Sequence, residues 1–146
     1  MKYLSLFVAA LIFVSCNAQE AQKVQELDKK ETATAASAQL AKNIAAADFK
    51  AAVEAAGPEV QLVDVRTPRE WAQGTLKGAD KINWNDSAFD QNIEGLDKTK
   101  AVYIYCRSGA RSGRAMARMK SLGFTEVYNL NGGIMAWQRA GYEVVK

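Results

Sequence analysis

Two patterns of apolar and polar positions alternate along the chain from about residue 41 to its end. Short apolar runs rich in β-branched and aromatic residues predict strands, and longer stretches with one apolar face predict helices. We expect strands over residues 60–65, 78–82, 101–105 and 127–130. We expect helices over residues 47–56, 111–122 and 134–140, a short one starting at Thr67-Pro68, and a loop or short helix over 85–96.

The alternation of strands and helices predicts the fold class. Such a sequence forms an α/β domain with a mostly parallel sheet and helices on both faces. The run AVYIY at residues 101–105 is apolar throughout, which suits a central strand covered on both faces. Ligands of such sheets bind outside the carboxyl ends of the strands, so the segment after Tyr105 is the first place to look for a site.

The start of the chain has the layout of an export signal. Lys2 precedes an apolar run over residues 4–14, and Ser15 stands just before Cys16. The run is shorter than the ~20 residues that a membrane-spanning helix needs. A cysteine directly after the run resembles a bacterial lipoprotein signal, in which Cys16 becomes the lipidated first residue of the mature chain. An ordinary cleaved signal with an incidental cysteine is the alternative.

The following residues, 16–40, are mainly Ala, Gln, Glu, Lys and Thr, without aromatic residues, glycine or proline. They predict a flexible tether between a lipid anchor and the domain over residues 41–146. A stable helix docked on the domain is the alternative. Together with the signal over residues 1–15, this organisation predicts an exported protein of the bacterial cell envelope. We expect it to be lipid-anchored to a membrane and to be either periplasm-facing or surface-exposed.

The composition of the chain excludes several kinds of catalytic site. Of 146 residues, 49% are hydrophobic and 24% charged, as in ordinary globular domains. The absence of histidine excludes a Ser-His-Asp triad, an H-E-x-x-H zinc site and a histidine general base. The net charge of +3 is too small to predict a nucleic-acid partner. The chain has two cysteines, and if Cys16 carries lipid, Cys106 has no partner in the chain.

The sequence CRSGARS at residues 106–112 lies between an apolar strand and a helix. Converging backbone N–H groups, the positive end of the helix and the charges of Arg107 and Arg111 should all lower the pKa of the Cys106 thiol. Five basic residues and no acidic ones lie between Arg107 and Lys120, so the local field is positive. We therefore expect a reactive thiolate that solvent can reach, and not a buried, inert cysteine.

From about residue 43 to the end, the chain resembles a single rhodanese-like (thiosulfate sulfurtransferase) domain. The matching segments are Leu62-Val63-Asp64-Val65-Arg66, Glu70-Trp71, Gly78-Ala79, CRSGARS and Gly132-Gly133-Ile134-Met135-Ala136-Trp137. The resemblance implies a three-layer domain with a central five-stranded parallel sheet and a catalytic cysteine that opens a six-residue loop. It implies that Cys106 is the nucleophile. The residues expected to surround its sulfur and bind substrate are Arg107, Ser108, Gly109, Ala110 and Arg111.

Other matching residues have expected supporting roles. Asp64 and Arg66, at the end of the preceding strand, should brace the neighbouring loops as a buried ion pair without a catalytic part. Trp84 and Trp137 should serve packing. One departure from the family is the segment Gly74-Thr75-Leu76, where relatives commonly have Gly-His-Ile. The missing imidazole removes a local proton-moving or orienting group and leaves the nucleophile in place.

Loop length bears on the substrate. Relatives that handle phosphate or arsenate use a cysteine, five residues and then an arginine, which makes a wider anion cradle. Here the arginine comes one residue early, at Arg111, and Ser112 occupies the sixth position after Cys106. The cradle should therefore fit a persulfide better than a phosphoryl group, which disfavours a phosphatase or an arsenate reductase.

The expected activity is a two-step transfer of sulfane sulfur through a persulfide on Cys106. A donor such as thiosulfate would supply the sulfur, and cyanide or a thiol would accept it, with no metal or organic cofactor. Expected partners are small sulfur-containing anions, thiol acceptors and, in one version, a protein acceptor. The alternative is a membrane-anchored persulfide carrier or redox-sensing binding module without fast turnover.

Overall fold

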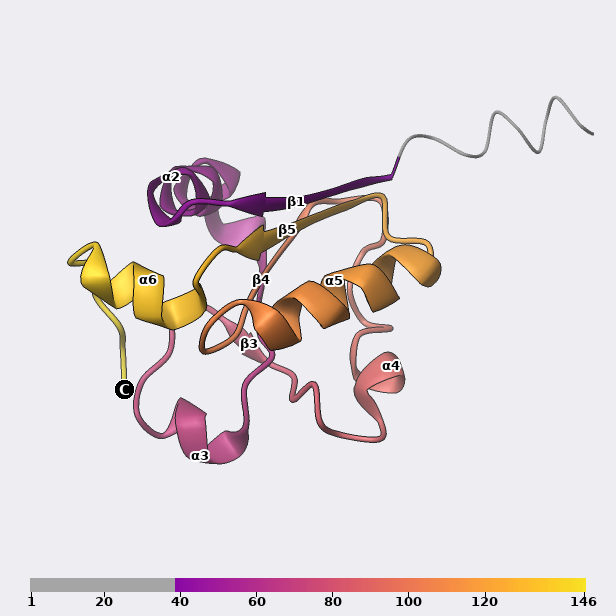
Figure 1. The fold of residues 1–146 in the computed structure, drawn as a ribbon. Helices are drawn as coiled ribbons and strands as arrows, with labels where there is room; N and C mark the ends of the chain where they lie inside the picture. The colour runs from indigo at the N-terminus through magenta and orange to yellow at the C-terminus, as the bar shows by residue number, and fades with distance from the viewer. Residues whose placement is uncertain (1–38) are drawn as a thin grey trace, which may run out of the picture. The chain divides into compact units, whose positions relative to one another are not determined.

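The computed structural model of the chain describes residues 39–146 (Figure 1). The predicted signal, the lipidated Cys16 and nearly all of the predicted tether lie outside the described residues, so these remain predictions. Among the helices of residues 39–146, none combines the length and the apolar character needed to cross a membrane.

The core of the domain is a parallel sheet of five strands. They are β1 (Leu40–Ile44), β2 (Gln61–Asp64), β3 (Asp80–Lys81), β4 (Val102–Tyr105) and β5 (Glu126–Leu130). Their order across the sheet is β1-β5-β4-β2-β3, and every neighbouring pair is parallel. The all-buried pattern of β4 fits its place at the centre of this order. The predicted five-stranded α/β fold is confirmed.

Strand β1 was not predicted from the sequence. Its residues LAKNI are mostly exposed, and it lies at the edge of the sheet, paired only with β5. An edge strand of this kind is held by backbone hydrogen bonds to its neighbour more than by buried side chains, so it leaves little apolar signal. Strand β3 is also shorter than the predicted segment, because only Asp80 and Lys81 pair with β2.

Helices cover both faces of the sheet, as predicted (Figure 1). They are α2 (Ala46–Ala56), the 3₁₀ turn η1 (Gly57–Glu59), α3 (Pro68–Trp71), α4 (Phe89–Asn92), α5 (Ala110–Ser121) and α6 (Gly133–Arg139). Phe89 of α4 and Met119 of α5 contribute to one buried cluster. Phe49 of α2 and Trp137 of α6 contribute to a second cluster. Trp84 is partly buried against the first cluster, so both tryptophans pack as expected.

The carboxyl ends of β2 and β4 lie side by side. Asp64 is the register partner of Tyr105, and the backbone N–H of Val65 donates to the Tyr105 carbonyl at 2.9 Å. The segments that follow the two strands therefore leave the sheet at the same edge. This pairing places Cys106, the first residue after β4, beside the residues that follow β2.

Candidate active site

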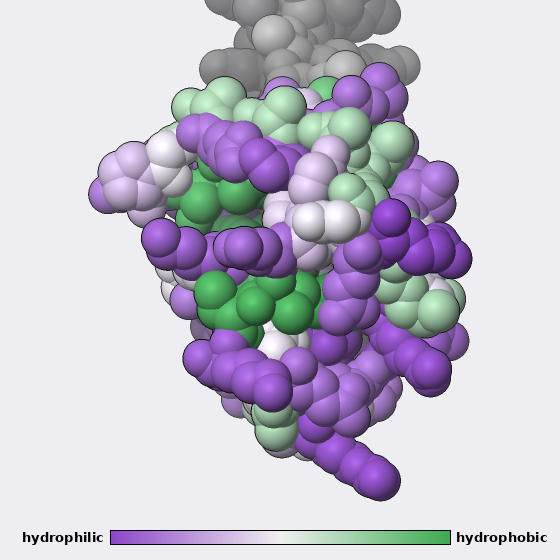
Figure 2. Space-filling model, turned by 90° about the vertical axis from the view of Figure 1, so that its left-hand side faces the viewer, coloured by the Kyte–Doolittle hydropathy of each residue, from purple (hydrophilic) through white to green (hydrophobic). Residues whose placement is uncertain are grey.

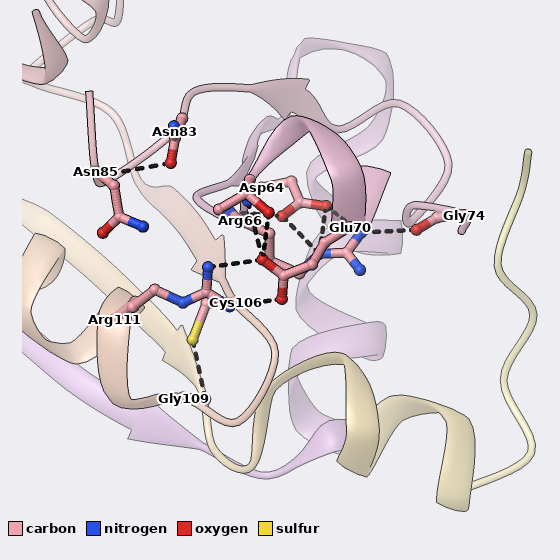
Figure 3. A network of polar contacts seen from close by, with 10 residues as sticks. Asp64, Arg66, Glu70, Gly74, Asn83, Asn85, Cys106, Gly109 and Arg111 are labelled. Carbon is pink, nitrogen blue, oxygen red and sulfur yellow. Dashed lines mark hydrogen bonds and ion pairs between the residues drawn. The ribbon is translucent and has the colours of Figure 1, made fainter. Parts of the chain in front are cut away.

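Cys106 opens a tight turn that leads from β4 into α5. The backbone N–H of Gly109 donates to Cys106 Sγ over 3.2 Å (Figure 3). Gly109 has a φ of 92°, and a Cβ at this position would lie 3.2 Å from the Gly132 nitrogen and 3.3 Å from the Leu130 carbonyl oxygen. Both conditions favour glycine, so this residue lets the turn close around the sulfur.

The ionisation of the Cys106 thiol is set by opposing effects. Burial is the largest influence and would raise the pKa of the thiol. It is outweighed by hydrogen bonds from the side chain and backbone of Ser112 and from the backbone N–H groups of Ser108 and Gly109, so the pKa lies below its ordinary value. The Ser112 hydroxyl also lies 3.3 Å from the Gly109 carbonyl and can serve only one acceptor at a time. The loop therefore stabilises the ionised form of the thiol by more than burial opposes it.

The expected access of solvent to the thiol is wrong for this structure. The Cys106 side chain is 0% exposed and belongs to the buried cluster that includes Ile104 and Ala115. The turn over residues 106–109 closes polar groups around the sulfur, and the apolar core lies against it. The prediction considered the polar loop alone and missed how closely the neighbouring elements cover it.

An ion pair between Arg111 and Glu70 lies beside the thiol (Figure 3). Arg111 donates to the two carboxylate oxygens of Glu70 at 2.7 and 2.6 Å. These bonds are the main reason that the pKa of Glu70 falls to about 2. The pKa of Arg111 is raised, first by Glu70 and further by the Cys106 thiolate. The two side chains are 17% and 18% exposed, so they form a partly covered layer next to a fully covered sulfur.

Glu70 is itself held by α3. Thr67 donates to Glu70 Oε2 from its backbone nitrogen at 3.1 Å and from its hydroxyl at 2.8 Å. The backbone bond is one of the two that form the capping box at the start of α3. The sequence comparison included Glu70 in a matching segment and assigned it no role. The T-x-x-E spacing signals a helix start, but nothing in the sequence indicates that its carboxylate reaches Arg111, 41 positions further along the chain.

The other loop residues have different positions. Arg107 is exposed, and its side chain lines a pocket together with residues of α3 and α6. Ser108 acts on the thiol through its backbone N–H, and Ala110 is an exposed first residue of α5. Of the five residues expected to surround the sulfur, Ser108, Gly109 and Arg111 therefore act on it in the structure. Ser112, which was considered only for loop length, joins them.

Asp64 and Arg66 form a buried ion pair at the end of β2. Arg66 Nη2 lies 2.6 Å from Asp64 Oδ2, and the same nitrogen donates to the Gly74 carbonyl at 2.6 Å. Burial would lower the pKa of Arg66, but its contacts with Asp64 outweigh this and raise it. The pair thus joins the end of β2 to the segment after α3. Next to Gly74, Thr75 bonds through its backbone to Val145 in both directions.

Helix α6 fixes the loop from the other side. The backbone nitrogen of Ile134 donates to the Cys106 carbonyl at 2.8 Å, and that of Met135 donates to the Arg107 carbonyl at 3.2 Å. A Cβ on Gly133 would lie 2.4 Å from the Cys106 carbonyl oxygen. From the sequence, Gly132 and Gly133 were named only as part of a matching segment, and this close approach was not predicted.

Chemically, the arrangement places a thiol whose ionised form is stabilised beside a guanidinium group. Such a group can attack an electrophilic sulfur and hold the negative charge of a persulfide. Within residues 39–146, no three His, Cys, Asp or Glu side chains come together in a way that could hold a metal ion.

Comparison with known proteins agrees with this geometry. The family model described as the rhodanese-like domain matches residues 45–140. A sulfurtransferase of Allochromatium vinosum is 42% identical over 87 residues, which cover 60% of this chain and 79% of that protein. YqhL of Bacillus subtilis, an uncharacterized protein, is 40% identical over 79 residues, which cover 54% of this chain and 61% of that protein.

The solved structures show the same likeness. The crystal structure of a rhodanese-like domain protein from Staphylococcus aureus matches with a TM-score of 0.61 and 30% identity, covering 72% of this chain and 99% of that one. A domain match over residues 45–140, a sheet of the same kind and a relative named as a sulfurtransferase support a sulfurtransferase family. The chain belongs to the family of rhodanese-like domains.

Proposed function

We propose that the protein transfers sulfane sulfur from a donor such as thiosulfate to a thiophilic acceptor, through a persulfide on Cys106. The observation that carries this proposal is the environment of the Cys106 sulfur. The sulfur accepts a hydrogen bond from the Gly109 N–H at 3.2 Å, and the pKa of the thiol is lowered although the thiol is buried. A small loop lined with N–H groups suits one added sulfur atom. The sulfurtransferase name of a 42% identical relative supports the same activity.

The first step consumes the donor. The Cys106 thiolate attacks the outer sulfur of thiosulfate, a new S–S bond forms, and the S–S bond of thiosulfate breaks. Its electron pair leaves with sulfite. The N–H groups of the loop and the Arg111 guanidinium stabilise the anionic persulfide. No proton moves in this step, so the lack of histidine is no obstacle.

The second step returns the enzyme to its starting state. Cyanide or a thiolate attacks the outer sulfur of the persulfide, and the bond between the two sulfurs breaks. Its electron pair returns to Cys106, which again becomes a thiolate. The acceptor leaves as thiocyanate or as a new persulfide.

One observation favours a second candidate function. Because the Cys106 side chain is 0% exposed, an acceptor reaches it only after a local rearrangement. This suits a persulfide carrier that releases its sulfur slowly, when a partner opens the site, or a redox-sensing module. The enzyme and the carrier share the loading step and differ in turnover.

Mass spectrometry of the intact chain tests the proposal. After exposure to thiosulfate, the mass should increase by one sulfur atom, and cyanide should remove that atom as thiocyanate. Cys106→Ser should take up no sulfur. Repeated formation of thiocyanate indicates an enzyme, whereas loading with a single slow release indicates the carrier. A wild-type chain that gains no sulfur would contradict both the enzyme and the carrier.

We also propose that the protein is exported in a bacterium and anchored to an envelope membrane by lipid on Cys16. The support is the order of the first residues: Lys2, an apolar run, Ser15 and Cys16. Fractionation of cells that produce the full chain tests this proposal. The protein should be in the membrane fraction, and Cys16→Ser should prevent lipid attachment. An unmodified amino terminus in the soluble fraction would contradict it.

A further inference from the structure

A pocket of about 490 Å³ lies between α3 and α6, next to the Cys106 loop. Figure 2 views the side of the domain on which α6 lies, where hydrophobic patches alternate with hydrophilic side chains. Arg69 and Glu70 line the pocket from α3, and Gln73 lines it from the turn after α3. Arg107 lines it from the loop, and Met135 and Gln138 line it from α6. Of these lining residues, only Glu70 belongs to the group of side chains described above as lying beside the thiol.

The pocket has two positive charges to offer a ligand. Arg66, which also lines it, is neutralised by Asp64, and Glu70 is neutralised by Arg111. Arg69 and Arg107 are exposed, and neither forms an ion pair within residues 39–146. Because guanidinium groups bind carboxylates with paired hydrogen bonds, the two side chains suit a ligand with two carboxylates.

The remaining lining suits the rest of such a ligand. Met135 is 41% exposed, one of the few large hydrophobic side chains left open among the described residues. Its thioether can contact an apolar or sulfur-bearing group. Gln73 and Gln138 are exposed and offer amide donors and acceptors at the rim. The pocket thus combines two cations, an apolar contact and amide groups around a volume sufficient for a small metabolite.

The pocket also adjoins the buried sulfur through shared residues. Arg107 directly follows Cys106 in the chain. Met135, in the pocket lining, donates to the Arg107 carbonyl at 3.2 Å. Glu70 also forms part of the lining, and it binds the Arg111 guanidinium that lies beside the thiol. A ligand in the pocket therefore lies against the residues that enclose the sulfur.

We propose that this pocket binds the sulfur acceptor, and that the acceptor is a small thiol bearing two carboxylates. The proposal rests on the sulfur-transfer function proposed above and names its acceptor class. The acceptor thiol loses its proton to water. After the local rearrangement that uncovers Cys106, the acceptor thiolate attacks the outer sulfur of the Cys106 persulfide. A new S–S bond forms, the Cys106–sulfur bond breaks, and the electron pair returns to Cys106. Arg69 and Arg107 hold the two carboxylates.

The first measurement is binding without transfer. Methylthiosuccinate, a dicarboxylate whose sulfur is blocked, is titrated into the full chain and followed by NMR. Wild type should bind it, and Arg69→Glu should weaken the binding by about tenfold or more, because one attraction becomes a repulsion. Arg114→Glu is the matched control, since it makes the same charge change at an exposed arginine of α5 outside the pocket. It should bind like wild type.

The second measurement is transfer from Cys106 already loaded with sulfur. Mercaptosuccinate carries two carboxylates, and cysteamine carries an ammonium group instead. Comparing each variant with wild type for the same thiol cancels the difference in intrinsic reactivity between the two thiols. Arg69→Glu should slow transfer to mercaptosuccinate by about tenfold and should not slow transfer to cysteamine. Arg114→Glu should change neither rate by more than about twofold.

The outcomes separate the two proposals. If methylthiosuccinate does not bind, or binds equally to wild type and Arg69→Glu, the pocket is not the acceptor site. If Arg69→Glu slows transfer to both thiols by the same factor, the pocket is likewise not the acceptor site. If binding depends on Arg69 but Cys106 takes up no sulfur from thiosulfate, the transfer function and the acceptor role both fall, and only a dicarboxylate site remains.

Discussion

At the scale of single residues, the Cys106 sulfur lies at a boundary between polar and apolar surroundings. Ser112 and the backbone N–H groups of Ser108 and Gly109 favour its ionised form, and the buried cluster around Ile104 excludes water. A thiolate that is stable but covered cannot react with a substrate in solution until some side chain moves. The partly exposed pair of Arg111 and Glu70 is the layer beside it. An anionic donor can compete with Glu70 for Arg111, so donor binding can separate the pair and uncover the thiol.

Replacing Glu70 should expose the thiol. In Glu70→Gln the charge-assisted bonds to Arg111 weaken by about 1.5–3 kcal/mol, which corresponds to about ten- to a hundredfold easier opening. The rate at which neutral iodoacetamide alkylates Cys106 should rise accordingly. Asp90→Asn is the control, because it weakens a similar bidentate pair with Arg118 that is exposed. An unchanged rate in Glu70→Gln would mean that this pair does not cover the sulfur.

At the scale of secondary-structure elements, what could be predicted depended on how much each element buries. The apolar runs of β2 and β4 and the glycine-containing loop after β4 were enough to predict the parallel sheet and Cys106. Strand β1 was not predicted because its side chains are mostly exposed. The pairing of Arg111 with Glu70 and the burial of the thiol were also not predicted. Both depend on how α3 and α6 pack against the loop, and no local sequence pattern indicates this packing.

The close contact between α6 and the loop predicts that position 133 does not tolerate a residue with a side chain. At Gly133, an alanine Cβ would lie 2.4 Å from the Cys106 carbonyl oxygen and 2.6 Å from the Arg107 carbonyl oxygen, at a φ of 58°. Strain and overpacking together should lower the free energy of unfolding of Gly133→Ala by about 2–4 kcal/mol. Urea unfolding measures the change. Gly95→Ala is the control, since its Cβ would meet nothing within 4 Å. Equal stability of the two variants would contradict the close approach.

At the scale of the whole molecule, two ion pairs tie the carboxyl edge of the sheet together. Asp64 and Arg66 join the end of β2 to the segment after α3, and Glu70 and Arg111 join α3 to α5. The second pair connects residues 41 positions apart, so it exists only in the folded chain. Folding therefore lowers the pKa of Glu70 from its ordinary 4.5 to about 2. A carboxylate with a lowered pKa stabilises the fold only while it is ionised.

This shift predicts how stability depends on acid. The contribution of Glu70 should be fully present above about pH 4.5 and should be lost as the pH falls toward 2. Measured by urea unfolding, wild type should exceed Glu70→Gln in stability by a constant amount near neutral pH, and the difference should shrink in acid. Glu94→Gln, which removes an exposed carboxylate without an ion pair among the described residues, should follow the wild-type curve. A difference that does not change with pH would contradict the shift.

The backbone bridge between Thr75 and Val145 has a practical consequence for handling the protein. The last residues run along the segment after α3, where a Cβ on Gly74 would lie 3.2 Å from the Val144 side chain. Gly74 also forms part of the pocket wall. A purification tag joined directly to Lys146 would disturb this contact and, through Gly74, the pocket in which methylthiosuccinate binding is measured. Protein with no tag after Lys146 is therefore the proper reference for these measurements.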